Sequence, residues 1–254
     1  MRFSSFVLVL AVGALTGCGP KMMTVDAGPD TSCGLDCAAQ TRYGLLLDNC
    51  FEYSTDNGTT SSPPSLGMWV QRQPMTADGL FELEGGVKSL VVEYRQGGQT
   101  VGTDYLGIKG GDLYLYRRIA GGQSVTFKTD QAITGVKWLT MSTAAGENYS
   151  TSTTAFLSRD DSSTATVYRI TTDVASGAEK KTPLMTYDTA VKVLFGETPD
   201  HGADPRRIFV PDVGFTVIAS PFSLLGGSPT PHYLQKVRSV TVGGAGDPCS
   251  LGTP

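Results

Sequence analysis

The sequence predicts an all-β protein, an antiparallel meander that forms a half-open barrel or a sandwich and contains little helix. Short apolar or alternating runs recur along the chain, and such runs are typical of strands. Gly-Gly and Gly-Asp pairs separate many of these runs, and glycine tolerates the positive φ that tight hairpin turns need. Long helical periods are absent, so a series of short strands joined by hairpins is the expected architecture.

The expected elements follow in chain order. One helix candidate covers residues 35–47, although Gly44 weakens it. The expected strands cover residues 51–54, 68–71, 81–84, 87–95, 101–108, 113–116, 124–128, 136–141, 149–158, 164–172, 185–195, 208–210, 215–219 and 233–242. Residues 159–162, Arg-Asp-Asp-Ser, form the expected turn between two of the later strands.

The N-terminus has a different pattern from the rest of the chain. Met1 and Arg2 precede an apolar run at residues 6–15, and the small residues Thr16 and Gly17 lead to Cys18. A short charged segment, an apolar segment of about ten residues and small residues before a cleavage point are typical of a secretory signal. The apolar segment is too short to span a bilayer.

Residues 15–18, Leu-Thr-Gly-Cys, resemble the lipobox of bacterial lipoproteins, whose cysteine thiol takes a diacylglyceryl group. The resemblance implies cleavage after Gly17, lipidation of Cys18 and a membrane anchor made of acyl chains. An ordinary signal peptide with an incidental cysteine is the alternative. No Asp follows the cysteine, and by resemblance to the enterobacterial sorting rule this implies the outer membrane. The leaflet stays open.

Three regions are therefore expected: a signal peptide (1–17), a lipidated N-terminus with a flexible tether (18–32) and a single β domain (33–254). Gly, Pro and Asp interrupt the tether, which reaches roughly 40 Å when extended. No later stretch supplies the ~18 apolar residues of a membrane span. An all-β domain can occupy the remaining length alone.

Five cysteines are present, and lipidation of one leaves Cys33, Cys37, Cys50 and Cys249 in an exported chain. Two disulfide bonds are expected, because exported proteins are oxidised. Among the three possible pairings, we expect Cys37 with Cys50 and Cys33 with Cys249, which would fasten the C-terminal tail to the start of the domain. A zinc site is the alternative, but no second close pair completes it.

Charge and motifs exclude several classes of function. The formal charge is −4, or −5 without the signal, and the basic residues form isolated doublets, so nucleic acid binding is not expected. The sequence contains no G-x-S-x-G, H-E-x-x-H or P-loop motif, so we expect no catalytic site, cofactor or metal. The polar segment 197–205 could hold a cation, but its prolines and glycine favour a solvated connection.

Residues 209–216, Phe-Val-Pro-Asp-Val-Gly-Phe-Thr, precede an expected strand at 232–237. Together they are similar to an aromatic–Pro–Gly–Val–Gly turn in some uncharacterised bacterial envelope β-proteins. Those proteins look like curved sheets related in shape to lipoprotein-carrier half-barrels, so the resemblance implies topology only. Asp212 stands where a glycine is usual. A tight turn between two edge strands is the alternative interpretation.

Seven aromatic residues lie in or beside consecutive expected strands. On a curved sheet they could line a concave apolar face that holds a lipid tail or a hydrophobic peptide. Equally, tyrosine is favoured in strands, where its ring covers the core. A binding cup needs an uncovered apolar concavity, whereas a packed core leaves none. The residues are Tyr94, Tyr105, Tyr114, Tyr116, Trp138, Tyr149 and Tyr168.

These observations predict a lipid-anchored envelope protein that acts as a non-catalytic binding or scaffold module at the outer membrane. Its expected partners are the membrane and a protein or an apolar ligand, which exposed edge strands could bind by strand pairing. One alternative is an envelope hydrolase that uses His201 or His232 and holds that histidine between a serine and a carboxylate. Another is a surface-displayed adhesion or motility component.

Overall fold

The computed structural model describes residues 33–57, 63–140, 150–159, 162–197, 206–219 and 230–239, together with Cys249. They belong to one compact unit, Thr31–Pro254. A short helix, α1 (Cys37–Arg42), precedes the strands, and a 3₁₀ turn, η1 (Glu84–Gly86), lies between two of them. The strands are β1 (Asn49–Ser54), β2 (Leu66–Gln71), β3 (Phe81–Leu83), β4 (Val87–Gln96), β5 (Gln99–Lys109), β6 (Asp112–Ala120), β7 (Gln123–Thr129), β8 (Ala132–Ile133), β9 (Val136–Leu139), β10 (Ser150–Arg159), β11 (Ser162–Val174), β12 (Val191–Glu197), β13 (Arg206–Val210), β14 (Gly214–Ala219) and β15 (Pro231–Ser239).

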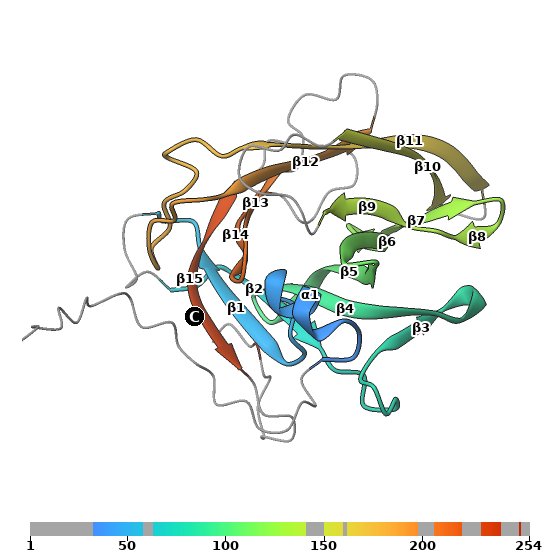
Figure 1. The fold of residues 1–254 in the computed structure, drawn as a ribbon, viewed down its shortest axis with the longest axis horizontal. Helices are drawn as coiled ribbons and strands as arrows, with labels where there is room; N and C mark the ends of the chain where they lie inside the picture. Colours follow the sequence, from blue (N-terminus) through green and yellow to red (C-terminus); the bar gives the residue numbers. More distant parts are fainter. Residues whose placement is uncertain are drawn as a thin grey trace, which may run out of the picture. The chain divides into compact units, whose positions relative to one another are not determined.

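The strands pair in one curved antiparallel sheet, which confirms the all-β meander (Figure 1). The order is β8-β7-β10-β11-β12-β13-β14-β15-β1-β2-β4-β5-β6-β9, and β3 pairs with β4. Most neighbours in space are neighbours in sequence, and β1 also pairs with β15, so the first and last strands lie side by side. Strand β7 pairs with both β6 and β10, which joins the two halves of the meander. The sheet is continuous, unlike the two facing sheets of a sandwich.

Two-residue glycine turns connect several strands, as the sequence predicts. Gly97 and Gly98, at φ +57° and +75°, link β4 to β5, and Gln96 pairs with Gln99 on either side of the turn. Such turns match the twist of the strands they join, but they require positive φ at both positions. This chemistry fixes the register of the hairpins, and with it the residues that face the core.

The helix is shorter than the predicted range 35–47, because the chain leaves helical geometry at Gly44. Gly44 has φ +66°, and a Cβ there would collide with the carbonyl oxygen of Val213. Leu45 and Leu47 therefore enter the core from an irregular segment, where both are at most 2% exposed. None of the helices in the described ranges has the length and apolar composition of a membrane span.

Two further predictions differ from the structure. Residues 185–190 precede β12 instead of belonging to it, because residues 181–186 form a separate turn. The turn at 211–213 joins β13 and β14, but neither is an edge strand, since β13 also pairs with β12 and β14 with β15. Arg159 pairs with Ser162 as expected, while residues 160 and 161 between them lie outside the described residues, as do 141, 149 and 240–242.

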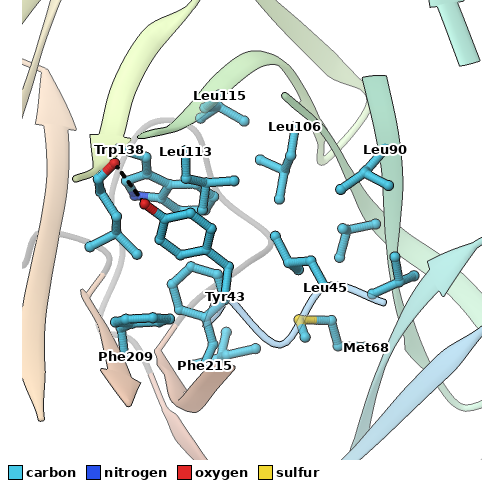
Figure 2. Packing of buried hydrophobic residues seen from close by; sticks show 14 of the residues in the cluster. Tyr43, Leu45, Met68, Leu90, Leu106, Leu113, Leu115, Trp138, Phe209 and Phe215 are labelled. Atoms are coloured by element: carbon cyan, nitrogen blue, oxygen red, sulfur yellow. Dashed lines mark hydrogen bonds between the residues drawn. The ribbon is translucent and has the colours of Figure 1, made fainter. Parts of the chain in front are cut away.

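The segment that contains α1 fills the inside of the curved sheet. Figure 2 shows Tyr43 and Leu45 between leucines of β4, β5 and β6 on one side and Phe209 and Phe215 on the other. The Tyr43 hydroxyl donates a hydrogen bond to the Gly111 carbonyl oxygen at 3.0 Å. Side chains from both halves of the chain thus share one core with the N-terminal segment.

Candidate functional site

The four cysteines of the β domain form two disulfide bonds, but the expected pairing is wrong. Cys33 is bonded to Cys37, and Cys50 to Cys249. Cys50 lies in β1 and is fully buried, and the Cys249 sulfur lies 3.7 Å from the Met68 carbonyl oxygen in β2. The C-terminal tail is therefore fastened to the domain as expected, but through the β1–β2 pair.

Local geometry explains the other bond. The Asp36 carboxylate accepts a hydrogen bond from the Ala39 N–H and caps the start of α1 at Cys37. The turn that leads into the helix brings the Cα atoms of Cys33 and Cys37 within 5.3 Å of each other, a separation that suits a disulfide. Cys18, the predicted lipidation site, lies outside the described residues.

Of the two histidines in the hydrolase alternative, the structure describes only His232. His201 and the polar residues 198–205 lie outside the described residues. His232 lies in β15, is buried, and has its Nδ1 atom 3.0 Å from Ser65 Oγ. Burial lowers the pKa of His232, so the ring is neutral at pH 7. Among the described side chains, no group of three His, Cys, Asp or Glu residues is placed to hold a metal ion.

The aromatic residues considered for a binding cup lie on both faces of the sheet. Tyr94 and Trp138 point into the core and are each 1% exposed, so the core interpretation is correct for them. Tyr105 and Tyr114 are half-buried on the outer face, and Tyr116, on that same side, stacks against Tyr114. Tyr149 lies outside the described residues. Tyr168 lies in β11, but its side chain is not among those described.

A cluster of ionised groups that no sequence pattern predicted lies inside the sheet. Asp104 in β5 accepts hydrogen bonds from Arg118 in β6 at 2.6 and 2.8 Å and from Arg207 in β13 at 3.0 Å. Tyr94 in β4 donates to Asp104 at 2.8 Å and accepts from Arg207 at 2.5 Å. The three charged side chains are at most 4% exposed. We call these four residues the buried charge cluster.

Aromatic rings surround the arginines of the buried charge cluster. The Arg207 guanidinium carbon lies 4.6 Å from the Trp138 ring centroid and 5.2 Å from that of Phe215, and Arg118 lies 5.3 Å from Trp138. Burial alone raises the pKa of Asp104, but the two guanidinium groups outweigh it and lower that pKa below its usual value. Because Arg207 comes from the far side of the domain, the cluster holds β13 to β5 and β6.

The outer face of β2, β4, β5, β6 and β9 carries a second arrangement, a set of aromatic rings covered by cations. Arg95 lies 5.1 Å from the Trp69 ring centroid, Arg117 lies 5.8 Å from that of Tyr105, and Lys137 lies 5.9 Å from that of Tyr114. All six side chains are partly exposed. We call them the aromatic face: Trp69, Arg95, Tyr105, Tyr114, Arg117 and Lys137.

Strand register places Tyr105 and Arg117 of the aromatic face beside each other on β5 and β6. Val91, Tyr105, Arg117 and Thr126 are successive cross-strand partners on β4, β5, β6 and β7. Phe81 in β3 packs against Tyr105 with 5.2 Å between ring centroids. The face therefore covers neighbouring strands of one sheet.

Ion pairs hold the cations of the aromatic face in place. Arg95 donates to Glu93 at 3.0 Å, and Lys137 lies 2.6 Å from Asp112. Arg117 donates to Glu84 at 3.3 Å, and Lys128 lies 2.9 Å from the same carboxylate. The nearby cations lower the pKa of Glu84, chiefly through the hydrogen bond from Lys128. The face thus combines rings, fixed cations and nearly balanced charge.

Comparison with known proteins identifies no relative: no protein-family model, no curated protein and no solved structure matches this chain.

Proposed function

We propose that this protein is anchored by lipid in the outer membrane and acts there as a non-catalytic binding module. The aromatic face is its binding surface, and its partner is an envelope protein. The lipobox resemblance at residues 15–18 supports the anchor, and the oxidised cysteines fit an exported domain. The observation that carries the proposal is the set of half-buried Trp and Tyr rings covered by Arg and Lys on one face.

The residue types of the aromatic face are those that contribute most to protein–protein binding. Trp, Tyr and Arg are enriched among residues whose truncation weakens complexes most. Their rings provide a large apolar area, while the paired charges supply directional contacts. Near balance of charge on the face favours a protein surface over a polyanion.

The aromatic face is also held in shape before binding. Arg117 donates to Thr126 Oγ1 at 2.9 Å as well as to Glu84, so its guanidinium is fixed at two points. Side chains already ordered lose less entropy in a complex, which increases affinity. Binding through strand edges has less support, because β8 and β9, which end the pairing order, have two and four residues.

The proposal is tested by photo-crosslinking of the full chain in intact cells. A photoreactive amino acid replaces Thr103, a partly exposed residue of β5 two positions from Tyr105, so that the face keeps its rings. We expect a discrete protein adduct. A Tyr105→Ala substitution in the same chain should reduce the adduct yield at least about tenfold, as for a hot-spot residue.

The control site is Lys236, an exposed residue of β15 several strands away from β5. The same photoreactive residue there should give no such adduct. Equal adducts from both sites, or an adduct at 103 that Tyr105→Ala leaves unchanged, would contradict binding through the aromatic face.

A further inference from the structure

A small hairpin outside the aromatic face presents two apolar side chains to solvent. Leu184 is 42% and Met185 is 45% exposed, and they are adjacent in sequence. The other large apolar side chains exposed in the described ranges, Met75 and Val237, occur singly. Single exposed apolar residues are normal on a protein surface, whereas an adjacent exposed pair at a turn indicates a contact site.

The hairpin is held in a fixed shape. Lys181 pairs with Thr186, and the Thr182 hydroxyl and N–H both donate to the Met185 carbonyl oxygen, at 3.1 and 3.0 Å. The Leu184 N–H donates to the Leu234 carbonyl oxygen of β15 at 3.3 Å. These backbone and hydroxyl hydrogen bonds fix the conformation of the tip, and the side chains of Leu184 and Met185 remain exposed to solvent.

The base of the hairpin belongs to the second hydrophobic cluster of the domain. Tyr187 is 6% exposed and belongs to this cluster. Its other members include Ala175 just after β11, Ala190 just before β12, and Val210 at the end of β13. The Tyr187 N–H donates to the Lys180 carbonyl oxygen at 3.0 Å. Because the base is rigid, the tip can insert into a lipid surface without local unfolding of the hairpin.

Two lysines precede the apolar tip in the hairpin. Lys181 is exposed, and the Lys180 ammonium group donates to the Asp188 carbonyl oxygen at 2.9 Å at the same end of the hairpin. Apolar side chains beside lysines are the chemistry of interfacial membrane binding, in which the former enter the headgroup region and the latter contact lipid phosphates.

We propose that residues 180–186 contact the lipid surface and set the orientation of the anchored domain. Leu184 and Met185 enter the headgroup region, and Lys180 and Lys181 bind anionic headgroups. This inference rests on the proposed anchor, because a tether that reaches roughly 40 Å keeps the hairpin close to the bilayer. A weak contact then suffices, since it forms within one tethered molecule.

The test replaces Met185 with tryptophan and measures its fluorescence on vesicles of phosphatidylethanolamine and brominated phosphatidylglycerol. Residues 19–254 are attached through an N-terminal histidine tag to a nickel-chelating lipid, so the experiment does not depend on natural acylation. We expect a blue shift on both kinds of vesicle, and on brominated vesicles roughly half of the fluorescence intensity that unbrominated vesicles give. The matched control is Met75→Trp, a methionine that is 94% exposed but has no lysine beside it, and its emission should not change.

A second variant tests the charge. Lys180→Gln with Lys181→Gln in the Met185→Trp chain should reduce the tryptophan quenching on brominated anionic vesicles. The quenching on brominated phosphatidylcholine vesicles, which carry no net charge, should stay unchanged. Equal quenching of the Met75→Trp and Met185→Trp chains, or none in either, would overturn the proposal. So would a blue shift that occurs only when envelope proteins are added, which would assign the tip to a protein partner. Failure of natural lipidation would remove the anchor and leave this measurement intact.

Discussion

Asp104→Asn is expected to destabilise the domain by about 3–5 kcal/mol, the cost typical of breaking a buried ion pair on one side. The substitution keeps the shape of the side chain but leaves the guanidinium groups of Arg118 and Arg207 without their shared carboxylate. Such a loss is a large part of the 5–15 kcal/mol by which folded proteins are usually stable. Urea unfolding followed by tryptophan fluorescence measures it, because Trp138 packs against both arginines.

The matched control is Asp112→Asn, which removes the carboxylate that pairs with Lys137 near the surface. Partly exposed ion pairs contribute about 1 kcal/mol or less, so this variant should unfold close to the wild type. If the two variants lost similar amounts of stability, the buried charge cluster would not hold β13 to β5 and β6.

The stability of the wild type and of Asp104→Asn should also differ in its dependence on pH. Because the folded-state pKa of Asp104 is lowered, its charge stabilises the fold above the unfolded-state pKa of about 3.9 and loses this effect as pH falls through the folded-state value. The difference in stability between wild type and Asp104→Asn should therefore be constant near neutral pH and shrink below about pH 4. A difference that grows with acid would have the wrong sign.

Removal of the Cys50–Cys249 bond by Cys50→Ala with Cys249→Ala is expected to cost about 5 kcal/mol. The bond closes a loop with a sequence separation of 199 residues, and in the chain-entropy model the loss on removal grows with loop length. Denaturant unfolding of the double variant should show the loss as a lower midpoint. Limited proteolysis should also release the C-terminal tail earlier, because its covalent link to β1 is gone.

The second disulfide supplies the control for this prediction. The Cys33–Cys37 bond has a sequence separation of only 4, so its removal by Cys33→Ala with Cys37→Ala is expected to cost about 2 kcal/mol in the same model. Equal losses from the two double variants would show that loop closure does not set the stabilisation.

Local patterns predicted most strands because strand period and turn chemistry are local properties. The runs at 87–95 and 101–108 became β4 and β5, and the glycine pair between them formed the expected turn. The helix predicted at 35–47 was too long because the chain leaves helical geometry at Gly44, and the core uses Leu45 and Leu47 from the irregular segment that follows. Tertiary packing overrides local preference there.

A bulge is the reason that Arg118, one residue of the buried charge cluster, was not predicted to lie inside. Strict alternation from Leu113 and Leu115 would place Arg117 inward and Arg118 outward. The register of β5 and β6 shifts so that Tyr116 is an extra residue, which turns Arg117 to the outer face and Arg118 to the core. A bulge of this kind has no clear sequence signal, so a doublet of arginines looked like surface charge.

Long-range pairing was the other limit. Which cysteines meet depends on β1 and β2 lying beside the C-terminal tail, and spacing along the chain does not contain that information. The six aromatic residues within the described ranges lie in strands as expected, but they were treated as one set. Their division into Tyr94 inside and Tyr105 outside follows from strand period, and it is this division that separates the core from the aromatic face.

The most direct test of a lipid-anchored, disulfide-bonded binding module is the intact mass of the mature protein isolated from membranes, before and after reduction. We expect the mass of residues 18–254 plus acyl chains, with a gain of four hydrogens on reduction of the two bonds. Extraction of outer and inner membranes separately would locate the acylated form. A mature chain without acyl chains, recovered in the soluble fraction, would contradict the anchor.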